Sequence, residues 1–398
     1  MKVADLYSGA GGMSFGFRAN PAFEMVGAAD VELGKPSTGH GAIECNSAYL
    51  ANIGLEPVAV DLSVCDPAVL RERFGLEDDL DVLLACPPCT GFSRVNWENH
   101  RRDDPRNWLV PRTALFVAEF KPSVVLMENA RELLTGKFRE NFEELARGLE
   151  RLGYEVHAGV HLLTRFGLPQ QRERALVVAV RRGLPLRTLD DLWSGSVVNE
   201  KATHVRRAIW HLPPLESGGR DPDDPAHTCT RIEGESLDRI RAMPHNGGSW
   251  RDLVGDPAGE RFLTQGMRRA MAKGRLNQFC DIYGRMSWDK PAPTIKRECC
   301  HAGNGRYSHP EQDRMCSVRE LALLQGFPSD FQFPSRSRKN AYRHVGDAVP
   351  PLISYQLSRL AEWIMTGRRP EPEELALAGT SLEPADIERA AVFARPLF

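Results

Sequence analysis

The first 180 residues alternate short β-branched runs with helical stretches, and this alternation restricts the possible folds more than any other feature. Strands that follow one another through helices build a parallel sheet that helices cover on both faces. We therefore predict an α/β fold with a doubly wound, Rossmann-like sheet that binds ligands beyond the carboxyl ends of its strands. The expected strands are Lys2–Leu6, Met25–Asp30, Val58–Val60, Asp81–Ala85, Val124–Glu128, Tyr154–Leu163 and Ala175–Val180. The expected helices include Ile43–Asn52, Pro67–Phe74, Trp108–Phe120 and Phe138–Leu152.

The composition of the chain changes near residue 183, where proline, glycine and aspartate become frequent and the alternation of strand and helix patterns ends. This composition indicates a second, smaller, loop-rich domain. Helical patterns return at Ser317–Gln325 and Pro350–Met365. We therefore expect a first domain over residues 1–190, the second over 191–330 and a closing segment over 331–370 that returns to the first. The tail, residues 371–398, holds six acids and two arginines, and we interpret it as a solvated segment rather than a docking site for a partner.

Charge and cysteine content exclude several classes of protein. The 51 Lys+Arg nearly balance the 53 Asp+Glu, which argues against histone-like binding of nucleic acid through bulk charge. No apolar run approaches the roughly 18–20 residues of a membrane span, and the N-terminus lacks a secretory pattern. Nine irregularly spaced cysteines then indicate a reducing, cytoplasmic setting. A zinc site joining Cys86 and Cys89 to Cys299, Cys300 and His301 is a minor alternative, and we expect no metal.

The first strand runs into a glycine-rich turn of the kind that binds nucleotide cofactors. Glycines let the backbone approach a ligand closely, although a tight turn without a ligand is the alternative. Asp30 ends the second expected strand and Asp61 follows the third, so both share the sheet edge with the turn. The first of these acids can bind ribose hydroxyls and the second an adenine amino group, although each could instead cap a helix. The candidate cofactor residues of the turn are Tyr7, Ser8, Gly9, Gly11 and Gly12.

A cysteine and a carboxylate follow the next two strands. The segment Cys86-Pro87-Pro88-Cys89 comes directly after Asp81–Ala85, and its prolines hold a cysteine rigidly where a nucleophile should face the crevice. Glu128 ends the following strand and is expected to face that cysteine across the same crevice. Taken singly, each has another interpretation: a buried thiol and an acid that caps a helix.

Six motifs stand in one order between residue 1 and about residue 365. They are DLYSGAGG at 5–12, PPCTGFS at 87–93, ENA at 128–130, QQRER at 170–174, GNGRYSHP with RE and QGFP between 303 and 328, and GDAVPP at 346–351. With these motifs in this order, the chain resembles the DNA (cytosine-5) methyltransferases, a family that uses S-adenosylmethionine. Each motif is short, but six in the family's order are specific.

The resemblance implies a covalent mechanism and assigns residues to it. Cys89 is the implied nucleophile at cytosine C6, which makes C5 able to take a methyl group. Glu128 is the implied acid at N3 and the exocyclic amine. Arg174 is expected to reach the cytosine O2, and Arg172 is expected to orient the glutamate. The resemblance also adds Pro87, Asp347 and Ala348 to the cofactor residues, S-adenosylhomocysteine as product, and a target base flipped out of the duplex.

Basic segments follow the nucleophile and occupy the middle of the second domain. The resemblance implies a closing loop over residues 90–107, with Ser93 and Arg94 as candidate DNA contacts. Residues 239–297 hold twelve Lys+Arg against five acids, a net charge of +7. Such charge is often a solvated face, but its place in the family's order indicates the region that recognises the target sequence. The candidate contacts there are Arg261, Arg268, Arg269, Lys273 and Arg275.

Three features depart from the family pattern. Thr90 replaces a glutamine beside the nucleophile, so we expect loop closure to differ in detail. Asp347 replaces an asparagine, and we hypothesise that its charge favours the cationic sulfonium of the cofactor over the neutral product. The connection over residues 32–43 is longer than usual, which makes Glu32 a rival to Asp30 for the ribose.

The resemblance implies an enzyme that marks specific sequences of double-stranded DNA in restriction–modification or phage defence. We expect it to act as a monomer on DNA, with restriction or defence proteins as candidate partners. A tRNA cytosine-5 methyltransferase of the same fold and a non-catalytic DNA-binding subunit are the alternatives. Labelled cofactor with duplex DNA or tRNA discriminates the first, and the complete set of Cys89, Glu128, Arg172 and Arg174 argues against the second.

Overall fold

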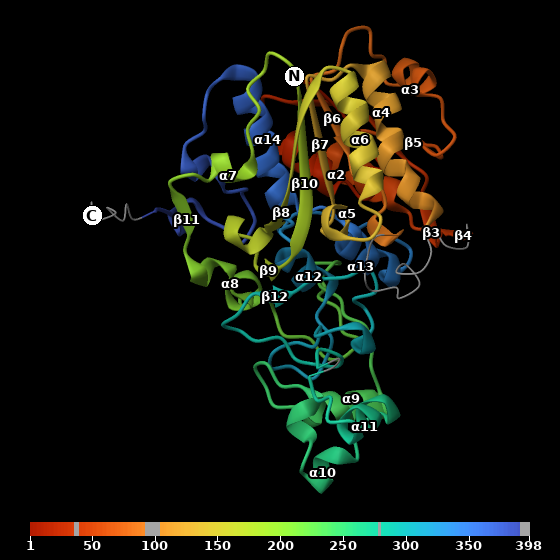
Figure 1. The fold of residues 1–398 in the computed structure, drawn as a ribbon. Coiled ribbons are helices and arrows are strands. Elements are labelled where there is room, and N and C mark those ends of the chain that lie inside the picture. The colour runs from red at the N-terminus through yellow and green to blue at the C-terminus, as the bar shows by residue number, and fades with distance from the viewer. Residues whose placement is uncertain (36–39, 92–103, 278–279, 391–398) are drawn as a thin grey trace.

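The computed structural model describes residues 1–35, 40–91, 104–277 and 280–390. A seven-stranded sheet forms its centre, in the order β5-β2-β1-β6-β7-β10-β8 (Figure 1). The strands are β1 (Lys2–Leu6), β2 (Glu24–Asp30), β5 (Val58–Ala59), β6 (Val82–Ala85), β7 (Val124–Ala130), β8 (Tyr154–Leu162) and β10 (Glu173–Arg181). Every expected strand is therefore present, within a few residues of its predicted bounds.

The sheet is mixed, which corrects the expectation of a parallel sheet. The pairs among β5, β2, β1, β6 and β7 are parallel, whereas β10 runs antiparallel to both β7 and β8. Only a short segment with a 3₁₀ turn at Leu163–Phe166 separates β8 from β10. Because a parallel pair needs a crossover of a dozen or more residues, these two strands form a hairpin. The α/β class itself is confirmed.

Helices cover both faces of the sheet, as predicted. On one face, α1 (Gly12–Ala19), α7 (Leu189–Leu192) and α14 (Pro351–Thr366) share a core with Val82 and Leu84 of β6. On the other face, α3 (Pro67–Arg73), α4 (Leu109–Phe120) and α6 (Glu140–Arg151) share a core with Leu83 and Ala85. No helix within the described ranges is both long enough and apolar enough to cross a membrane.

The end of the chain returns to its beginning through a close helix contact. A Cβ on Gly16 of α1 would lie 2.1 Å from the backbone nitrogen of Tyr355 in α14, so only glycine allows this crossing. Beside them, α2 (Cys45–Ile53) follows two short strands, β3 (Leu33–Lys35) and β4 (His40–Ala42), which pair antiparallel. Residues 350–366 thus complete the layer that residues 12–19 begin.

A second region extends from the sheet (Figure 1). Its larger core joins α8 (Val205–Ile209), α12 (Val318–Leu324) and α13 (Arg338–Asp347). A smaller cluster around Trp250 supports the tip farthest from the sheet, which carries α9 (Gly234–Ala242), α10 (Pro257–Glu260) and α11 (Gln265–Ala272). Long segments without helix or strand connect these elements, in agreement with the loop-rich character expected from the sequence.

The acidic tail packs on the protein as far as the structure describes it, to Ala390. Its strand β13 (Ile387–Arg389) pairs antiparallel with β11 (Ser196–Val198). Leu375, Leu377 and Leu382 are buried in the core that α14 shares with the sheet. The interpretation of this segment as solvated is therefore wrong, because apolar residues interleaved with the acids anchor it. Residues 391–398 lie outside the described ranges.

Candidate active site

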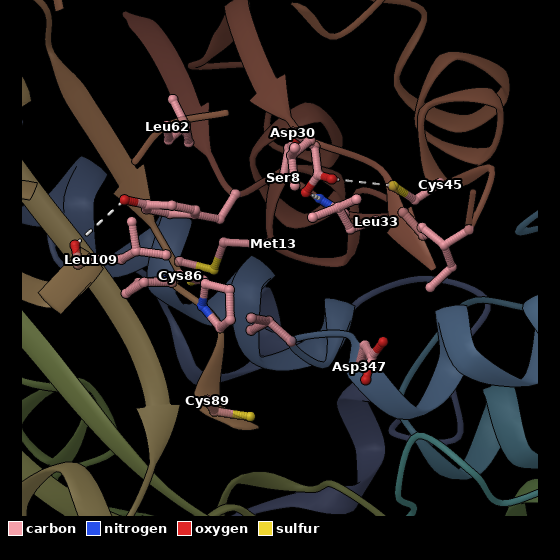
Figure 2. Close-up of a pocket in the computed structure, with 18 of the residues that line it drawn as sticks. Ser8, Met13, Asp30, Leu33, Cys45, Leu62, Cys86, Cys89, Leu109 and Asp347 are labelled. Carbon is pink, nitrogen blue, oxygen red and sulfur yellow. Dashed lines mark hydrogen bonds between the residues drawn. The ribbon is translucent and has the colours of Figure 1, made fainter. Parts of the chain in front are cut away.

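A cavity of about 450 Å³ opens at the carboxyl edge of the sheet, where β1, β2, β6 and β7 end (Figure 2). Residues far apart in the sequence meet there because the ends of parallel strands share one edge. Gly11, Arg172 and Arg174 are not among the residues of its wall. The expected residues that line it are Tyr7, Ser8, Gly9, Gly12, Asp30, Asp61, Pro87, Cys89, Glu128, Asp347 and Ala348.

The turn after β1 exposes its backbone to the cavity. Gly9 and Gly11 have φ angles of 52° and 90°, in the left-handed region that favours glycine. Tyr7 adopts a φ of 62° without being glycine, a strained conformation of the kind found at functional sites. Its hydroxyl donates to Leu109 O at 3.4 Å, which holds the ring on the cavity wall.

Two glycines of the turn permit close packing in different directions. A Cβ on Gly12 would lie 2.4 Å from Val349 O, so this glycine lets the turn meet the segment after α13. A Cβ on Gly11 would lie 3.1 Å from Ile53 and 3.2 Å from Tyr49. Gly11 therefore serves the contact with α2, and it does not face the cavity.

Asp30 is a carboxylate whose acceptor positions are mostly taken by the protein. Its Oδ2 accepts from Gly9 N at 3.0 Å, and its Oδ1 accepts from Glu32 N at 2.7 Å and from the Cys45 thiol at 3.5 Å. Since each carboxylate oxygen offers two lone pairs, Oδ2 keeps one position for a ligand. The rival, Glu32, does not line the cavity, and its carboxylate accepts from Asn46 N at 2.8 Å.

Asp61, the expected acceptor for the adenine amino group, also lies in the cavity wall. It is exposed, and its Oδ1 accepts from Ser63 N at 2.8 Å within a turn. Asp66, and not Asp61, caps the helix that follows, so the helix-capping alternative is wrong for Asp61. Val60 and Leu62 flank it on the cavity wall. Asp61 is therefore flanked by two apolar residues in the wall, with Ser63 next to them.

A buried polar network beneath the turn has no counterpart in the sequence-based prediction. Asp5 Oδ2 accepts from the Ser14 hydroxyl at 2.6 Å, and Ser14 Oγ lies 2.7 Å from Tyr49 Oη. Desolvation raises the pKa of Asp5 to about 7, and the Ser14 hydrogen bond opposes this shift. In the described chain, Asp5 Oδ1 and Ser8 Oγ are buried without a hydrogen-bond partner. Such orphaned atoms are rare in folded proteins. Ser8 lines the cavity, where a ligand can supply the partner, whereas Asp5 does not line it.

Cys89 begins a single 3₁₀ turn, Cys89–Gly91, just after β6. Asn129, fully buried on β7, donates from Nδ2 to Pro87 O at 2.9 Å and so fixes the segment that carries the thiol. Burial raises the pKa of the Cys89 thiol, and the Arg174 guanidinium opposes this shift. Because the thiolate is the reactive form, the chemistry of Cys89 depends on nearby positive charge.

Glu128 makes its ion pair with Arg174, which corrects the expectation that Arg172 orients it. Arg174 Nε lies 2.9 Å from Glu128 Oε1. Arg172 is buried instead against the backbone and donates to Ile295 O at 3.0 Å and to Ala348 O at 3.3 Å. Desolvation, followed by repulsion from Arg174, lowers the pKa of Arg172 to about 9, so it is still a cation at neutral pH.

Arg172 belongs to a buried set of hydrogen bonds that joins four segments. Gln170 Nε2 donates to Gln325 Oε1 at 2.6 Å, and Gln325 Nε2 donates to Ala348 O at 2.9 Å. Ile295 N donates to Gln170 Oε1 at 2.9 Å. The segments around residues 170, 295, 325 and 348 are thus fixed to one another beside the cavity.

Asp347 lines the cavity with a cationic partner that the sequence did not indicate. Arg297 Nη1 donates to Asp347 Oδ2, and Arg297 also lines the cavity. Desolvation raises the pKa of Asp347 to about 6, and the attraction of Arg297 opposes this shift. Figure 2 shows Asp347 and Cys89 in the same part of the cavity, away from Leu62 and Asp30.

Many residues of the wall were missed because they come from segments without a motif. Leu33 and Ile43 belong to the long connection after β2, so its unusual length was the one signal that pointed to them. Arg106 belongs to the closing loop expected over residues 90–107, and the remaining residues lie in segments whose sequence gives no indication of a cavity. The missed wall residues include Met13, Val31, Leu33, Ile43, Cys45, Arg106, Trp108, Leu109, Arg297 and His344.

The candidate DNA contacts of the second region gather at its tip. Arg268 and Arg269 lie on α11, whose buried Met267 packs against the cluster around Trp250. All five predicted side chains there are exposed: Arg261, Arg268, Arg269, Lys273 and Arg275. Ser93 and Arg94 lie outside the described residues.

The possible metal ligands do not gather as the zinc alternative required. Within the described residues, the group of three or more side chains that could hold an ion consists of Glu298, Cys300 and His301. Neither Cys86 nor Cys89 belongs to it. Glu298 Oε1 already pairs with Arg343 at 2.7 Å, which places a positive charge where a metal ion would bind. All nine cysteines are free thiols.

Comparisons with known proteins agree with the motifs. The model of a family described as C-5 cytosine-specific DNA methylase matches residues 1–361. The type II methylase M.HgiDII of Herpetosiphon aurantiacus is 30% identical over 369 residues, 92% of this chain and 96% of the relative. The type II methyltransferase M1.BsuMI of Bacillus subtilis is 30% identical over 371 residues, 90% of this chain and 79% of the relative.

A solved structure shares the fold across nearly the whole chain. The crystal structure of the S. pombe Dnmt2 methyltransferase superposes with a TM-score of 0.57 at 18% sequence identity. The match covers 91% of this chain and 98% of that one. At this level of identity the likeness concerns the fold alone.

Proposed function

Since the chain belongs to the C-5 cytosine-specific DNA methylase family, we propose that it transfers a methyl group from S-adenosylmethionine to C5 of a flipped-out cytosine in specific sequences of double-stranded DNA. The enzyme class, DNA (cytosine-5) methyltransferase, follows from the family. The type II methylases among its relatives support a role in restriction–modification or phage defence. The observation that carries the proposal is that Cys89 and Glu128 meet in the wall of one cofactor-sized cavity.

The cavity suits S-adenosylmethionine in size and in the chemistry of its wall. Its volume of about 450 Å³ lies within the roughly 300–1,000 Å³ of ligand pockets. Asp30 keeps one acceptor position for a ribose hydroxyl, and Asp61 can accept from the adenine amine. The orphaned Ser8 Oγ offers a further polar contact. The cofactor, when bound, supplies an electrophilic methyl group on a sulfonium.

Catalysis begins with the Cys89 thiolate. Cytosine C5 is a poor nucleophile, and attack of the thiolate on C6 makes C5 enamine-like. The guanidinium of Arg174, which opposes the rise in the pKa of Cys89, favours this thiolate. C5 then takes the methyl group, which leaves S-adenosylhomocysteine. Water accepts the C5 proton, the N3 proton returns to Glu128, and elimination of Cys89 as a thiolate restores the aromatic ring.

Glu128 keeps negative charge off the ring while Cys89 is attached. Its carboxyl group hydrogen-bonds N3 and the exocyclic amine of the cytosine and acts as the acid at N3. Glu128 Oε1 is buried and, among the described residues, has the ion-pair contact with Arg174 but no aligned hydrogen bond. The oxygen is thus available to the base, and we assign to Arg174 the contact with the cytosine O2.

Recognition falls to the second region, roughly residues 191–330. The exposed basic face around α11 supplies contacts to phosphates and base edges. Flipping the target out of the duplex costs on the order of a few kcal/mol, which these contacts must offset. We also propose that the protein works as a monomer on DNA, in the cytoplasm.

Bisulfite sequencing of DNA from cells that express the chain tests the proposal. Protected cytosines within one short sequence are the expected result, and the same cells with the Cys89→Ala variant should give none. Uniformly converted DNA from the wild-type cells would contradict the proposal. Protection of cytosines in tRNA instead would favour the tRNA methyltransferase alternative.

A further inference from the structure

Two opposite charges, Arg297 and Asp347, lie side by side in the cavity wall. Arg297 Nη1 donates to Asp347 Oδ2. The Arg297 side chain is 23% exposed and the Asp347 side chain 36%, and both line the cavity. The pair therefore has polar surface open to a ligand, and Figure 2 shows its Asp347 in the part of the cavity that also holds Cys89.

The backbone on both sides fixes this ion pair in place. Asp347 ends α13, and a Cβ on the preceding Gly346 would lie 2.3 Å from Lys296 O. The last turn of α13 thus packs directly on the backbone that carries Arg297. Residue 295, two positions earlier, is held by Gln170 and Arg172. The two charges consequently keep their positions without a ligand.

We propose that Arg297 and Asp347 together bind the α-amino-acid end of S-adenosylmethionine, with Arg297 donating to the α-carboxylate and Asp347 accepting from the α-ammonium. This assignment rests on the proposed function. The α-ammonium and the α-carboxylate of an amino acid are attached to the same carbon, and Arg297 and Asp347 likewise lie side by side. Each charge of the ligand can therefore lie against the opposite charge of the wall. A guanidinium has five donors and a carboxylate two oxygens, so both can bind the ligand without giving up their own contact. Charge-assisted hydrogen bonds of this kind are the strong ones.

The ion pair also changes the expectation for Asp347 from its charge alone. Because Arg297 lies against the Asp347 carboxylate, most of the attraction of that carboxylate for a sulfonium is cancelled. The amino-acid end is the same in the cofactor and in the product. Replacing Asp347 should therefore weaken the binding of the cofactor and of the product to the same extent. The hypothesis that Asp347 favours the sulfonium requires instead that the ratio of the two affinities change.

Calorimetric titration of the full chain without DNA tests the assignment. The ligands are S-adenosylmethionine, its decarboxylated form and 5′-methylthioadenosine, which lacks the whole amino-acid end. The wild type should bind S-adenosylmethionine at least about tenfold more tightly than the decarboxylated form. Arg297→Gln should reduce this ratio to about one. A ratio in Arg297→Gln that stays at the wild-type value would overturn the proposal.

Arg106→Gln is the matched control. Arg106 also lines the cavity, is 23% exposed as well, and pairs with a neighbouring aspartate, Asp104. This variant should keep the wild-type ratio, so an equal loss in both arginine variants would mean that bulk charge and not position matters, which contradicts the proposal.

Two further measurements keep the test decisive. Unchanged binding of 5′-methylthioadenosine shows that a variant retains its cavity. If Arg297→Gln does not fold, Asp347→Asn is measured in its place. Asp347→Asn should weaken the binding of S-adenosylmethionine and of S-adenosylhomocysteine by the same factor. A change in the ratio of these two affinities would overturn the proposal. A wild type that binds S-adenosylmethionine without preferring it to the decarboxylated form refutes this inference alone, whereas a wild type that binds none of the ligands refutes the proposed cofactor.

Discussion

At the sheet edge, the side chains that fix the segments around Cys89 are buried and hydrogen-bonded before any ligand arrives, whereas the predicted basic contacts on and beside α11 are all exposed. Asn129, Gln170 and Arg172 are each at most 2% exposed, and each has hydrogen bonds to the backbone of a distant segment. The difference indicates that the chemistry is preorganised, while recognition takes its final geometry from the ligand.

Within the second region, too, some basic side chains are buried and hydrogen-bonded while others are exposed. Its basic stretch, residues 239–297, has a net charge of +7 in the sequence. Arg285 is fully buried and donates to Ile240 O at 2.9 Å, and Arg239 is buried and donates to Phe262 O. These two arginines hold the region together, so the charge available to DNA is smaller than the sequence count suggests.

The largest expected effect is at the preorganised edge. Cys89→Ala should lower methyl transfer to duplex DNA at least about a thousandfold, because no other group supplies the nucleophile. Binding of S-adenosylmethionine should stay near the wild-type value. Transfer of labelled methyl groups and calorimetric titration measure the two properties. Residual transfer within tenfold of the wild type would remove Cys89 from the mechanism.

A second prediction tests whether the exposed tip stands on a rigid core. Glu320 is fully buried, and both of its oxygens lie 2.7 Å from Arg314. Glu320→Gln leaves the arginine buried without its partner, which should cost about 3–5 kcal/mol of stability. Chemical denaturation measures this loss, and Asp289→Asn, which removes an exposed partner of Arg206, should leave the midpoint unchanged. Equal midpoints for both variants would show that the region has no such core.

The same carboxyl group predicts a pH dependence. Hydrogen bonds and the charge of Arg314 overcome desolvation and lower the pKa of Glu320 from 4.5 to about 2. Because the folded-state pKa lies below the unfolded value, the stabilisation is complete above about pH 4.5 and is lost as the pH falls toward 2. Glu320→Gln should flatten the stability profile in this range, and a variant with the wild-type slope would argue against the ion pair.

The fourth prediction distinguishes chemistry from binding at the sheet edge. Glu128→Gln should lower kcat about a hundredfold or more, since the amide cannot act as the acid at N3. The KM for DNA should change little, because Glu128 meets only the flipped base. Steady-state kinetics with duplex DNA separates the two constants. A variant that raised KM and left kcat unchanged would move Glu128 from catalysis to recognition.

The smallest effect is expected at the exposed tip. Arg268→Ala should weaken duplex binding by a few fold at every sequence and reduce the slope of log K against log salt by about one, as for a phosphate contact. Arg147→Ala, an exposed arginine on α6, is the control and should change neither. Loss of discrimination between sequences in Arg268→Ala would instead make this side chain a reader of bases.

The sequence predicted the strands and much of the cavity wall, because each motif follows a strand whose end is dictated by topology. Turns such as 7–12 and segments such as 86–89 need only local information and the rule that parallel strand ends meet. The run from Tyr154 to Val180 indicated two adjacent strands joined by a turn near residues 166–169, and β8 and β10 are adjacent. The antiparallel orientation of β10 to β7 was not predicted, because strand patterns alone do not fix orientation.

The partner of Glu128 was missed because it depends on how β7 and β10 pair. The place of Arg297 was missed because contacts with Gln170 and Arg172, more than a hundred residues away, hold its segment. The prediction of a solvated tail was wrong because it rested on net charge and left four apolar residues out of account. These residues are buried: Leu375, Leu377, Leu382 and Ile387.

The central claim is that Cys89 attacks C6 of a cytosine held at the sheet edge. Duplex DNA that carries 5-fluorocytosine at the target position tests it directly, since the fluorine cannot leave as the proton does and the adduct is not released. With S-adenosylmethionine, the wild type and Cys86→Ala should each give a protein–DNA band that survives denaturing electrophoresis, and Cys89→Ala should give none. A covalent band from Cys89→Ala, or its loss in Cys86→Ala alone, would contradict the account.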